Sequence, residues 1–265
     1  MKTVTSRDNP VLKKARKLLT RKGRAEASAF LAEGRKLISE AKNAGYQTEC
    51  VFINAGAFIR GEAVAGAFEN ECLLEENLFN SLSQTQTPQP YIAIVTRDDN
   101  VSKEAGDPGA PERILVLDRI SDPGNVGTMI RTALASDISE VWCVKETADV
   151  FSDKAIRASA GAVFYMTVRE GLSAADCISR ARGMGAKIIV CDAGGTNLYD
   201  NILTGRLVIV IGNESDGPES EFMNAADSVA GIPMSAEAES LNAATAAAII
   251  MYEALRQREA AMKGE

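Results

Sequence analysis

The stretch LVLDRISDPGNVGTMIRTALAS, residues 115–136, decides the fold that we expect for this chain. It begins with a short apolar run that is typical of a buried strand and ends with the apolar spacing of a helix. Between them lie the residues Asp-Pro-Gly-Asn-Val-Gly, which have the composition of a turn. A glycine-bearing turn between a strand and a helix often holds a nucleotide phosphate at the helix N-terminus. The stretch therefore predicts a ligand site at the end of a strand in an α/β protein.

Short apolar strands and helices alternate from Arg113 to the end of the chain, which is typical of a doubly wound, largely parallel sheet. We expect strands at residues 113–118, 140–145, 162–168, 187–193, 206–214 and 228–234, and helices at 126–136, 153–160, 173–184, 219–226 and 241–258.

A smaller α/β domain precedes this sheet. We expect its helices at residues 10–19, 29–44, 61–68 and 77–83, and its strands at 49–54, 71–76 and 91–97. The polar residues that follow contain two prolines and two glycines without any apolar periodicity, which is typical of a linker. The expected domains are therefore residues 1–97 and 113–265, joined by a linker at 98–112.

The composition excludes several kinds of site. The chain has no histidine, which removes the commonest general base and the commonest metal ligand. Its five cysteines are scattered without a C-x-x-C motif, so neither a zinc site nor a disulfide framework is expected. Its apolar runs are too short to span a bilayer, and its first residues lack a signal-peptide pattern. We therefore expect a cytoplasmic protein that binds no metal and no membrane.

The charge is distributed unevenly along the chain. The formal net charge is −7, yet residues 1–45 contain 12 Lys and Arg against 4 Asp and Glu, a balance of +8 that leaves −15 for the rest. A basic end on an acidic body is expected when one part of a protein binds a polyanion. A solvated basic helix face explains the same charges equally well.

Three loops follow expected strands at the edge where open α/β sheets bind ligands: residues 118–133, 211–221 and 232–254. The first contains neither G-x-G-x-x-G nor a P-loop motif. The strand after it ends in lysine, where a nicotinamide-binding protein would carry an acidic residue. The phosphate of a nucleotide cofactor is therefore poorly supported at this turn.

Several residues of these loops are open to two interpretations. Asn125 is a candidate helix N-cap or polar contact. Arg131 is expected at a packed boundary of its helix, where it is either a functional residue or a structural partner of Asp118, Asp122 or Glu214. Glu214 itself is either a site carboxylate or an ordinary loop residue. The alanines of the last helix offer small faces for a core or a subunit interface, although helix propensity explains them as well.

Three motifs occur in a fixed order along the second domain. They are D-R-x-x-D-P-G-N-V-G-x-x-I-R-T-A, then V-I-G-N-E-x-x-G, then I-P-M-x-x-x-x-E-S-L-N before a helix that carries Y-E near its end. In this order they resemble the SpoU (TrmH-like) family, RNA ribose 2′-O-methyltransferases of the SPOUT superfamily. The N-terminal residues TSRDNPVLKKARKLLTRKGR and FLAEGRKLISEA resemble the substrate-binding domain of the family's ribosomal-RNA branch. The resemblance covers almost the whole chain.

The resemblance implies a small α/β RNA-binding domain followed by a C-terminal α/β-knot domain, whose parallel sheet is tied in a trefoil knot that holds S-adenosylmethionine. It also implies a homodimer. It places the cofactor on Gly212, Ile232 and Leu241, with Ile211, Met234 and Ala243 as neighbours. It places the catalytic arginine on Arg131, a partner asparagine on Asn125, and further polar active-site positions on Glu214, Ser240 and Asn242.

The chain departs from the family pattern in two places. Ala236 stands where the third motif usually carries glycine, and Ala243-Ala244 stands where it usually carries Val-Ser. The second departure removes a hydroxyl next to the expected site wall. The basic end would contact RNA phosphates, and Lys13, Lys14, Arg21 and Arg24 are the candidate contacts.

Methyl transfer to a ribose hydroxyl requires in-line alignment and removal of the hydroxyl proton. Without histidine, the candidate bases are Arg131, Glu214 and the aspartates of the first loop. The resemblance favours Arg131, although an arginine side chain is almost always protonated. Either a special environment deprotonates Arg131, or Arg131 orients an RNA phosphate while water or Glu214 takes the proton. We favour the phosphate role and leave the base open, which makes the first loop the RNA side of the site.

The sequence favours large-subunit ribosomal RNA as the substrate, because of the N-terminal domain, and leaves transfer RNA as an alternative. A knotted RNA-binding or ribosome-assembly factor without catalysis is a second alternative, and the retained polar residues argue against it. A nicotinamide-dependent α/β enzyme is a third, and the missing dinucleotide fingerprint argues against it.

Overall fold

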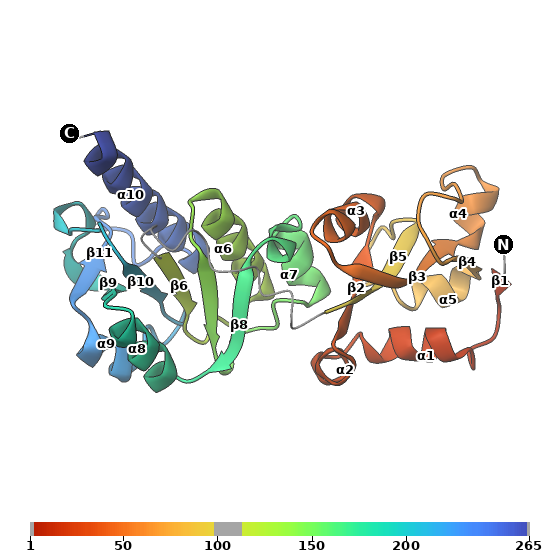
Figure 1. Ribbon diagram of the computed structural model, residues 1–265, viewed down its shortest axis with the longest axis horizontal. Helices are drawn as coiled ribbons and strands as arrows, with labels where there is room; N and C mark the ends of the chain where they lie inside the picture. The colour runs from red at the N-terminus through yellow and green to blue at the C-terminus, as the bar shows by residue number, and fades with distance from the viewer. Residues whose placement is uncertain (1–2, 98–112, 264–265) are drawn as a thin grey trace. The chain divides into compact units, whose positions relative to one another are not determined.

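The computed structural model describes residues 3–97 and 113–263 (Figure 1). The described residues form two compact units, and the first is discontinuous, since it combines residues 3–97 with 151–164. The other described residues make up the second unit. The expected linker at residues 98–112 lies outside the described residues. Within the described part of the chain, no helix is long and apolar enough to cross a membrane.

The first unit is built on a five-stranded mixed sheet of strand order β1-β4-β3-β5-β2. Strand β5 is antiparallel to both of its neighbours, whereas β1, β4 and β3 run parallel to one another. The strands are β1 (Thr3–Val4), β2 (Ala29–Glu33), β3 (Gln47–Asn54), β4 (Glu71–Leu74) and β5 (Tyr91–Thr96). Its helices are α1 (Pro10–Lys17), α2 (Arg21–Ala27), α3 (Arg35–Asn43), α4 (Ala55–Ile59) and α5 (Glu76–Asn80).

The helix expected over residues 29–44 is wrong in its first part, because Ala29–Glu33 is strand β2 and the helix begins only at Arg35. Strand β2 pairs with β5 along its whole length, and every residue in it is buried. Gly34 separates strand from helix with a φ of 99°, a conformation that residues with a side chain rarely adopt. The pairing partner is distant in sequence, so local apolar spacing did not reveal the strand.

Two other expected elements also differ in the structure. Residues 61–68 form turns instead of a helix, and the short helix of this region is α4, which lies earlier. The strand expected at 162–168 is divided into a 3-10 turn, η1 (Ala162–Phe164), and strand β8 (Thr167–Leu172). The apolar residues of η1 are buried in the first unit instead of pairing in a sheet.

An aromatic cluster completes the core of the first unit. The ring of Phe30 lies 5.1 Å from that of Phe151, 5.7 Å from that of Phe164 and 6.0 Å from that of Tyr46. The guanidinium of Arg97 lies 4.0 Å above the ring of Phe151. Phe151 and Phe164 flank helix α7 (Asp153–Ala158). This core is therefore assembled from two stretches that are far apart in the sequence.

The second unit is a six-stranded sheet of order β11-β9-β10-β6-β7-β8 in which every pair of neighbours is parallel, as the sequence predicted. Besides β8, its strands are β6 (Arg113–Leu117), β7 (Glu140–Val144), β9 (Lys187–Asn197), β10 (Leu207–Ile211) and β11 (Ser228–Gly231). Its helices are α6 (Pro123–Ala135), α8 (Ala174–Gly183), α9 (Ser220–Ala225) and α10 (Ala243–Lys263), with a 3-10 turn, η2 (Leu198–Asp200).

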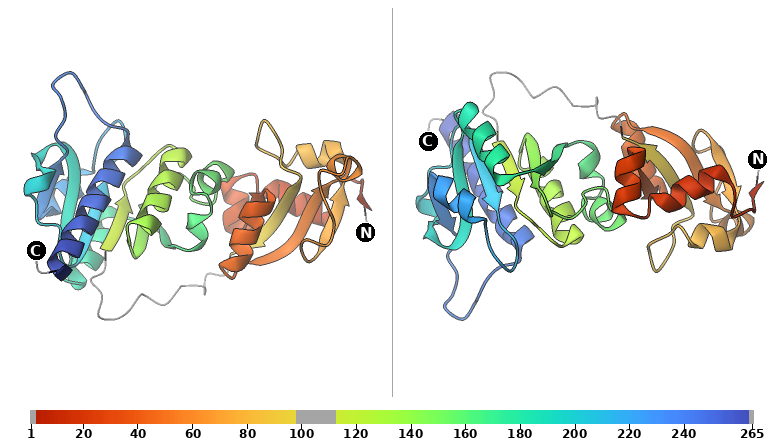
Figure 2. Two further views of the ribbon diagram at one scale, coloured as in Figure 1. Left: turned by 90° about the horizontal axis from the view of Figure 1, so that it is seen from above. Right: turned by 90° about the horizontal axis from the view of Figure 1, so that it is seen from below.

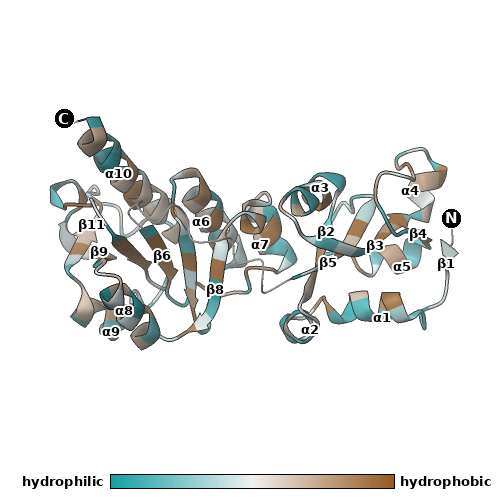
Figure 3. Cartoon of the chain, in the orientation of Figure 1, coloured by the Kyte–Doolittle hydropathy of each residue, from teal (hydrophilic) through white to brown (hydrophobic). Residues whose placement is uncertain are grey.

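Helices cover both faces of this sheet. Helices α6 and α10 pack side by side on one face, and α8 and α9 pack on the other (Figure 2). The central strands β6 and β10 are almost entirely hydrophobic (Figure 3), and all of their residues are buried, as expected for strands covered on both faces. Ile211 is in register with Leu117 on one side and with Cys191 on the other, so β6 and β10 end at one level of the sheet, whereas β9 continues beyond it.

Candidate active site

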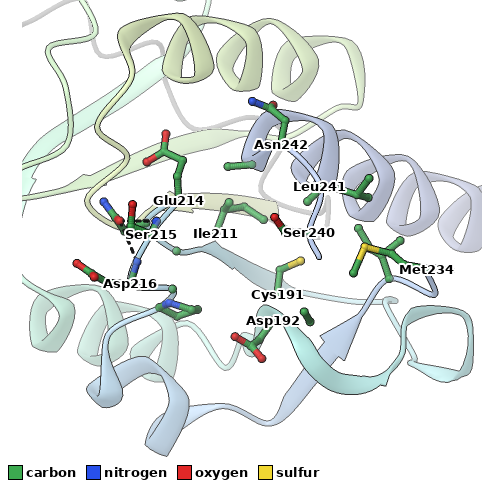
Figure 4. Close-up of a pocket in the computed structure, with 18 residues that line it drawn as sticks. Cys191, Asp192, Ile211, Glu214, Ser215, Asp216, Met234, Ser240, Leu241 and Asn242 are labelled. Atoms are coloured by element: carbon green, nitrogen blue, oxygen red, sulfur yellow. Dashed lines mark hydrogen bonds between the residues drawn. The ribbon is translucent and has the colours of Figure 1, made fainter. Parts of the chain in front are cut away.

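A cavity of about 550 Å³ lies at the carboxyl end of β10, beside residues 191–193 of β9 (Figure 4). Its wall is completed by the loop after β10 and by the segment between β11 and α10. Open α/β sheets bind ligands at this edge, and the volume is typical of a small-molecule site. All six residues that the resemblance assigns to the cofactor line this cavity: Ile211, Gly212, Ile232, Met234, Leu241 and Ala243.

The backbone of the loop after β10 approaches Gly212 too closely for any side chain. A Cβ atom built on Gly212 would lie 2.2 Å from the nitrogen of Pro218 and 2.5 Å from the carbonyl carbon of Gly217. The side-chain oxygen of Asn213 holds the loop in shape by accepting hydrogen bonds from the N–H groups of Ser215, at 2.8 Å, and Asp216, at 3.1 Å. The loop is thus a backbone-lined cradle, which suits a ligand bound mainly by main-chain groups.

Asp118 and Arg119 anchor this loop, and sequence reasoning did not assign them that role. Asp118 is fully buried, and its carboxylate accepts hydrogen bonds from the backbone N–H of Glu219, at 2.7 Å, and from Arg119, at 3.0 Å. Arg119 also donates to the carbonyl of Gly217 at 3.1 Å. The D-R pair at the start of the first motif was the available signal, since it stands at the end of a buried strand.

A chain of polar side chains connects helix α6, the loop after β10 and the segment before α10 beside the cavity. The Oδ1 atom of Asn242 accepts from the N–H groups of Ala244, at 2.9 Å, and Thr245, at 3.2 Å, at the start of α10. Its amide nitrogen must therefore point the other way, where it donates to Asn125 at 3.0 Å. Asn125 in turn donates to the carboxylate of Glu214 at 2.9 Å. The structure thus brings Asn125, Glu214 and Asn242 together in one hydrogen-bonded chain.

Glu214 is held by several donors at once. Its carboxylate also accepts from the backbone N–H of Ser121, at 3.1 Å, and from the hydroxyl of Ser121, at 3.0 Å. Partial burial would raise the pKa of Glu214, but the hydrogen bonds from Asn125 and Ser121 outweigh this effect and hold the pKa below its ordinary value. A carboxylate in this state is a weak base, so the geometry suits an anchor for Asn125 better than a proton acceptor.

Other residues of the first loop differ from expectation. The N-cap of α6 is Asp122, whose carboxylate accepts from the N–H of Gly124, whereas Asn125 lies within the helix. Arg131 is exposed on α6 and not at a packed boundary. Within residues 3–97 and 113–263 it forms no hydrogen bond or ion pair, so the structural pairings considered for it are absent.

The remaining polar candidate of the third loop, Ser240, is exposed and lines the cavity together with Asn242 (Figure 4). Arg131 and Asn125 do not line it. The cofactor candidates therefore line the cavity, whereas Asn125 is connected to it only through its hydrogen bonds with Glu214 and Asn242.

The four basic candidates of the first unit are not equivalent. Lys13 pairs with Asp8 at 2.7 Å, Lys14 pairs with Glu49, and Arg21 is exposed. Arg24 is only 7% exposed and donates to the carbonyl of Leu18 at 2.8 Å, which ties α2 to the end of α1. Arg24 is therefore a structural residue and is not available to contact a phosphate, which corrects the expectation for this position.

The cavity has the features that S-adenosylmethionine requires. Ile211, Ile232 and Leu241 offer apolar walls, and Gly212 allows the backbone of Gly217 and Pro218 to close in and line the cavity. Across the described residues, no group of three or more Cys, Asp or Glu side chains is arranged to hold a metal ion.

Comparison with known proteins agrees with this geometry. Residues 112–252 match the SpoU rRNA Methylase family, and residues 9–93 match the MRM3-like substrate binding domain. The chain belongs to the SpoU rRNA methylase family. Within the family it is similar to RlmP of Bacillus subtilis, named 23S rRNA (guanosine(2553)-2′-O)-methyltransferase, with 31% identity over 95% of this chain and 98% of that protein.

Solved structures of SpoU methyltransferases share the fold. AviRb from Streptomyces viridochromogenes, in complex with AdoMet, superposes with a TM-score of 0.80 at 27% identity, covering 94% of this chain and 98% of that one. An AdoMet-bound rRNA methyltransferase from Sinorhizobium meliloti gives a TM-score of 0.80 at 30% identity, covering 96% of this chain and 97% of that one. Full-length similarity to family members with bound AdoMet supports the cavity as the cofactor site.

Proposed function

We propose that this protein transfers the methyl group of S-adenosylmethionine to a ribose 2′-hydroxyl of large-subunit ribosomal RNA. The observation that carries the proposal is the cavity itself, which gathers all six expected cofactor residues next to the Glu214–Asn125–Asn242 chain. The similarity to RlmP and to AviRb supports ribosomal RNA over transfer RNA as the substrate.

The cofactor supplies an electrophilic methyl group, and the protein supplies alignment. Ile211, Gly212 and Leu241 would hold the cofactor at the strand ends. Asn125 is fixed from both sides by Glu214 and Asn242, so we assign it the task of orienting the ribose. Positioning of this kind accounts for a large part of the rate in two-substrate reactions.

Arg131 stands on the same helix as Asn125 and points a charged side chain to solvent. We assign it to an RNA phosphate, because guanidinium groups bind phosphate in a bidentate fashion and are poor bases. The weak basicity of Glu214 leaves water as the acceptor of the 2′-hydroxyl proton.

The division of labour along the chain is part of the proposal. Residues 1–97 would bind RNA and residues 113–265 would carry out the reaction, joined by residues 98–112. Lys13, Lys14 and Arg21 would contact phosphates, with Arg24 supporting them from inside. An enzyme that modifies ribosomal RNA works where ribosomes are assembled, so we place it in the cytoplasm.

We also propose a homodimer and a knotted C-terminal region. Helices α6 and α10 pack together and expose apolar side chains, with Leu134 at 41%, Tyr252 at 49% and Met262 at 70% exposure. Such a surface suits a second copy of the chain. Close backbone contact between β9 and β11 is compatible with the knot, since a Cβ on Gly195 would lie 2.6 Å from the carbonyl oxygen of Val229.

Methyl transfer from radiolabelled S-adenosylmethionine tests the proposed reaction. Purified protein is incubated with unmodified 23S rRNA or with total tRNA, and the labelled nucleotide is mapped. A 2′-O-methyl group in 23S rRNA supports the proposal. Labelling of tRNA alone would reassign the substrate, and cofactor binding without transfer to either RNA would favour a non-catalytic RNA-binding factor.

Two variants test the assigned roles. Arg131→Ala is expected to abolish transfer while cofactor affinity changes by less than about twofold, and Thr132→Ala on the same helix serves as control. The double variant Lys13→Glu and Arg21→Glu is expected to weaken RNA binding. The slope of log affinity against log salt concentration should also become shallower, by roughly the value of one phosphate contact for each residue changed. If RNA affinity did not change with salt concentration, the basic segment would be a solvated surface that does not contact RNA phosphates.

A further inference from the structure

The charged residues that line the cofactor cavity are all acidic. Asp192, Glu214 and Asp216 are among its lining residues, and no lysine or arginine is (Figure 4). Carboxylates that line a cavity without a lysine or arginine among the lining residues create a negative potential inside it. Arg119 lies behind Gly217 and offsets the charge of Asp216 in part. A ligand with a net positive charge is therefore favoured over a neutral ligand of the same shape.

The three carboxylates are not equally placed to exert this effect. Glu214 is neutralised in part by donors from Ser121 and Asn125. Asp216 is exposed, so water screens its charge. Asp192 is half-buried and directly follows Cys191, the residue of β9 in register with Ile211 at the end of β10.

The orientation of Asp192 is fixed by the backbone. Its Oδ1 atom accepts a hydrogen bond from the N–H of Gly194 at 2.8 Å. Its Oδ2 atom lies 3.8 Å from the position that a Cβ on Gly217 would occupy, so the carboxylate faces the loop after β10. Among the described residues it forms no ion pair. Asp192 is thus a half-buried negative charge in the cavity wall that lacks a protein counter-charge.

The charge of Asp192 also affects the thiol of the neighbouring residue, Cys191. Cys191 also lines the cavity, and burial together with the charge of Asp192 raises the pKa of its thiol to about 11. At neutral pH the thiol is therefore protonated and is no nucleophile for an electrophilic methyl group.

We propose that Asp192 makes this cavity selective for a cationic ligand, so that it holds the sulfonium cofactor more tightly than the neutral thioether product. The inference rests on the proposed function and adds a residue that discriminates substrate from product. Because the product is held less tightly, it leaves more readily after each turnover and competes less well with fresh cofactor.

The charge difference follows from the balance of the reaction. S-adenosylmethionine carries a sulfonium, an ammonium and a carboxylate, a net charge of +1. In methyl transfer the ribose oxygen forms a bond to the methyl carbon, and the carbon–sulfur bond breaks with its electron pair staying on sulfur. The hydroxyl proton passes to water. S-adenosylhomocysteine therefore leaves as a neutral zwitterion, with one positive charge fewer than the cofactor that entered the cavity.

Titration calorimetry with three ligands tests the proposal without measuring activity. The ligands are S-adenosylmethionine, S-adenosylhomocysteine and sinefungin, which carries an ammonium group in place of the methylated sulfur. The Asp192→Asn variant removes the charge but keeps an acceptor for the N–H of Gly194. Asp200→Asn, in the 3-10 turn η2 outside the cavity, is the matched control.

We expect Asp192→Asn to weaken the binding of S-adenosylmethionine and of sinefungin about tenfold, or ~1.4 kcal/mol. The affinity for S-adenosylhomocysteine should change less than about threefold. In the unaltered protein the preference for the cationic ligands should also shrink as salt is added. An equal loss for all three ligands would overturn the proposal and make Asp192 a structural residue. If none of the ligands binds the unaltered protein, the proposed function itself fails, which is a distinguishable result.

Discussion

The space around Gly212 leaves no room for a Cβ atom, which would lie 2.2 Å from the nitrogen of Pro218. The obstacle is backbone, so the loop after β10 would have to move to accept any side chain. We expect Gly212→Ala to lower cofactor affinity at least tenfold and to destabilise the protein by about 2 kcal/mol, as overpacking usually does. Calorimetric titration and urea unfolding measure the two effects.

Gly183→Ala is the control for this change. Gly183 ends helix α8, and apart from its chain neighbours and the backbone of that helix no atom of the described residues lies within 4 Å of a Cβ built on it. Alanine is a better helix former than glycine, so we expect unchanged affinity and equal or slightly greater stability. If Gly212→Ala behaved like this control, the cradle would be more flexible than the close contacts indicate.

Glu140 gives a prediction about acid stability. Burial alone would raise the pKa of its carboxyl, but hydrogen bonds from Arg169, at 2.7 and 2.9 Å, and from Trp142, at 2.7 Å, hold the pKa below its ordinary value. A depressed pKa stabilises the fold above the pKa of the unfolded chain, and this contribution is lost as the pH falls through the folded pKa.

We therefore expect Glu140→Gln to lower the free energy of unfolding by about 1 kcal/mol at neutral pH. The difference from the unaltered protein should vanish as the pH drops below the ordinary glutamate range of about 4.3. Urea unfolding across pH 3 to 7 measures it, with Glu237→Gln in an exposed loop as control. A deficit that persisted unchanged at the acid end would contradict the ion-pair explanation.

At individual positions, the sequence indicated which motif residues lie close together better than it indicated the surroundings of the charged residues. Gly212 and Leu241 line one cavity because motifs that follow parallel strands meet at one edge of the sheet. The burial of Arg24 was not predictable from its basic neighbours, since it depends on the carbonyl of Leu18 at a helix end. Asp192 was missed because it lies outside the three motifs.

Asn242, the residue before helix α10, makes two kinds of hydrogen bond. Asn242 caps the helix through its Oδ1 atom and donates to Asn125 through its amide nitrogen. Asn242→Asp keeps the capping oxygen but replaces the donor, so we expect stability within about 0.5 kcal/mol of the unaltered protein together with a large loss of methyl transfer. Asn242→Ala should lose transfer and also about 1 kcal/mol of stability.

Thermal unfolding and single-turnover transfer separate these two tasks. If Asn242→Asp retained full transfer, the contact with Asn125 would have no part in the reaction. If both variants were equally unstable, the donor contact and not the helix cap would account for the structural contribution of this residue.

The elements of the second unit were largely predictable, whereas those of the first were less so. Strands such as β6 and β10 are continuous apolar runs bounded by turn residues, and this pattern is specific for a buried parallel sheet. Strand β2 has a similar apolar run, but helix α3 follows it at once, so the sequence pattern also fits the first turns of that helix. Only the pairing of β2 with β5 shows that these residues form a strand and not the beginning of the helix.

On the scale of the whole molecule, residues 151–164 belong to the first unit although they lie between two strands of the second. Phe164 is 2% exposed and stacks on Phe30. We expect Phe164→Ala to destabilise the first unit by about 3–5 kcal/mol, because a buried aromatic ring is lost. Hydrogen exchange of the full chain should show the loss in β2 and β5, with little change in β9 and β10.

Phe58→Ala is the matched control, since that ring is 37% exposed and lies in the same unit. This substitution should lower the free energy of unfolding by less than about 1 kcal/mol. Loss of protection spread evenly over β9 and β10 would contradict the grouping of residues 151–164 with the first unit. Local sequence patterns carry no sign of this grouping, because it depends on contacts between distant aromatic residues.

The discontinuous first unit also sets an order of events during synthesis. A ribosome completes β5 long before it adds Phe151 and Phe164, so Phe30 and Tyr46 emerge without the rings that cover them. The apolar residues of the nascent first unit therefore stay exposed until synthesis has passed residue 164. A protein whose family modifies ribosomal RNA would itself depend on the ribosome and its attendant chaperones through this interval.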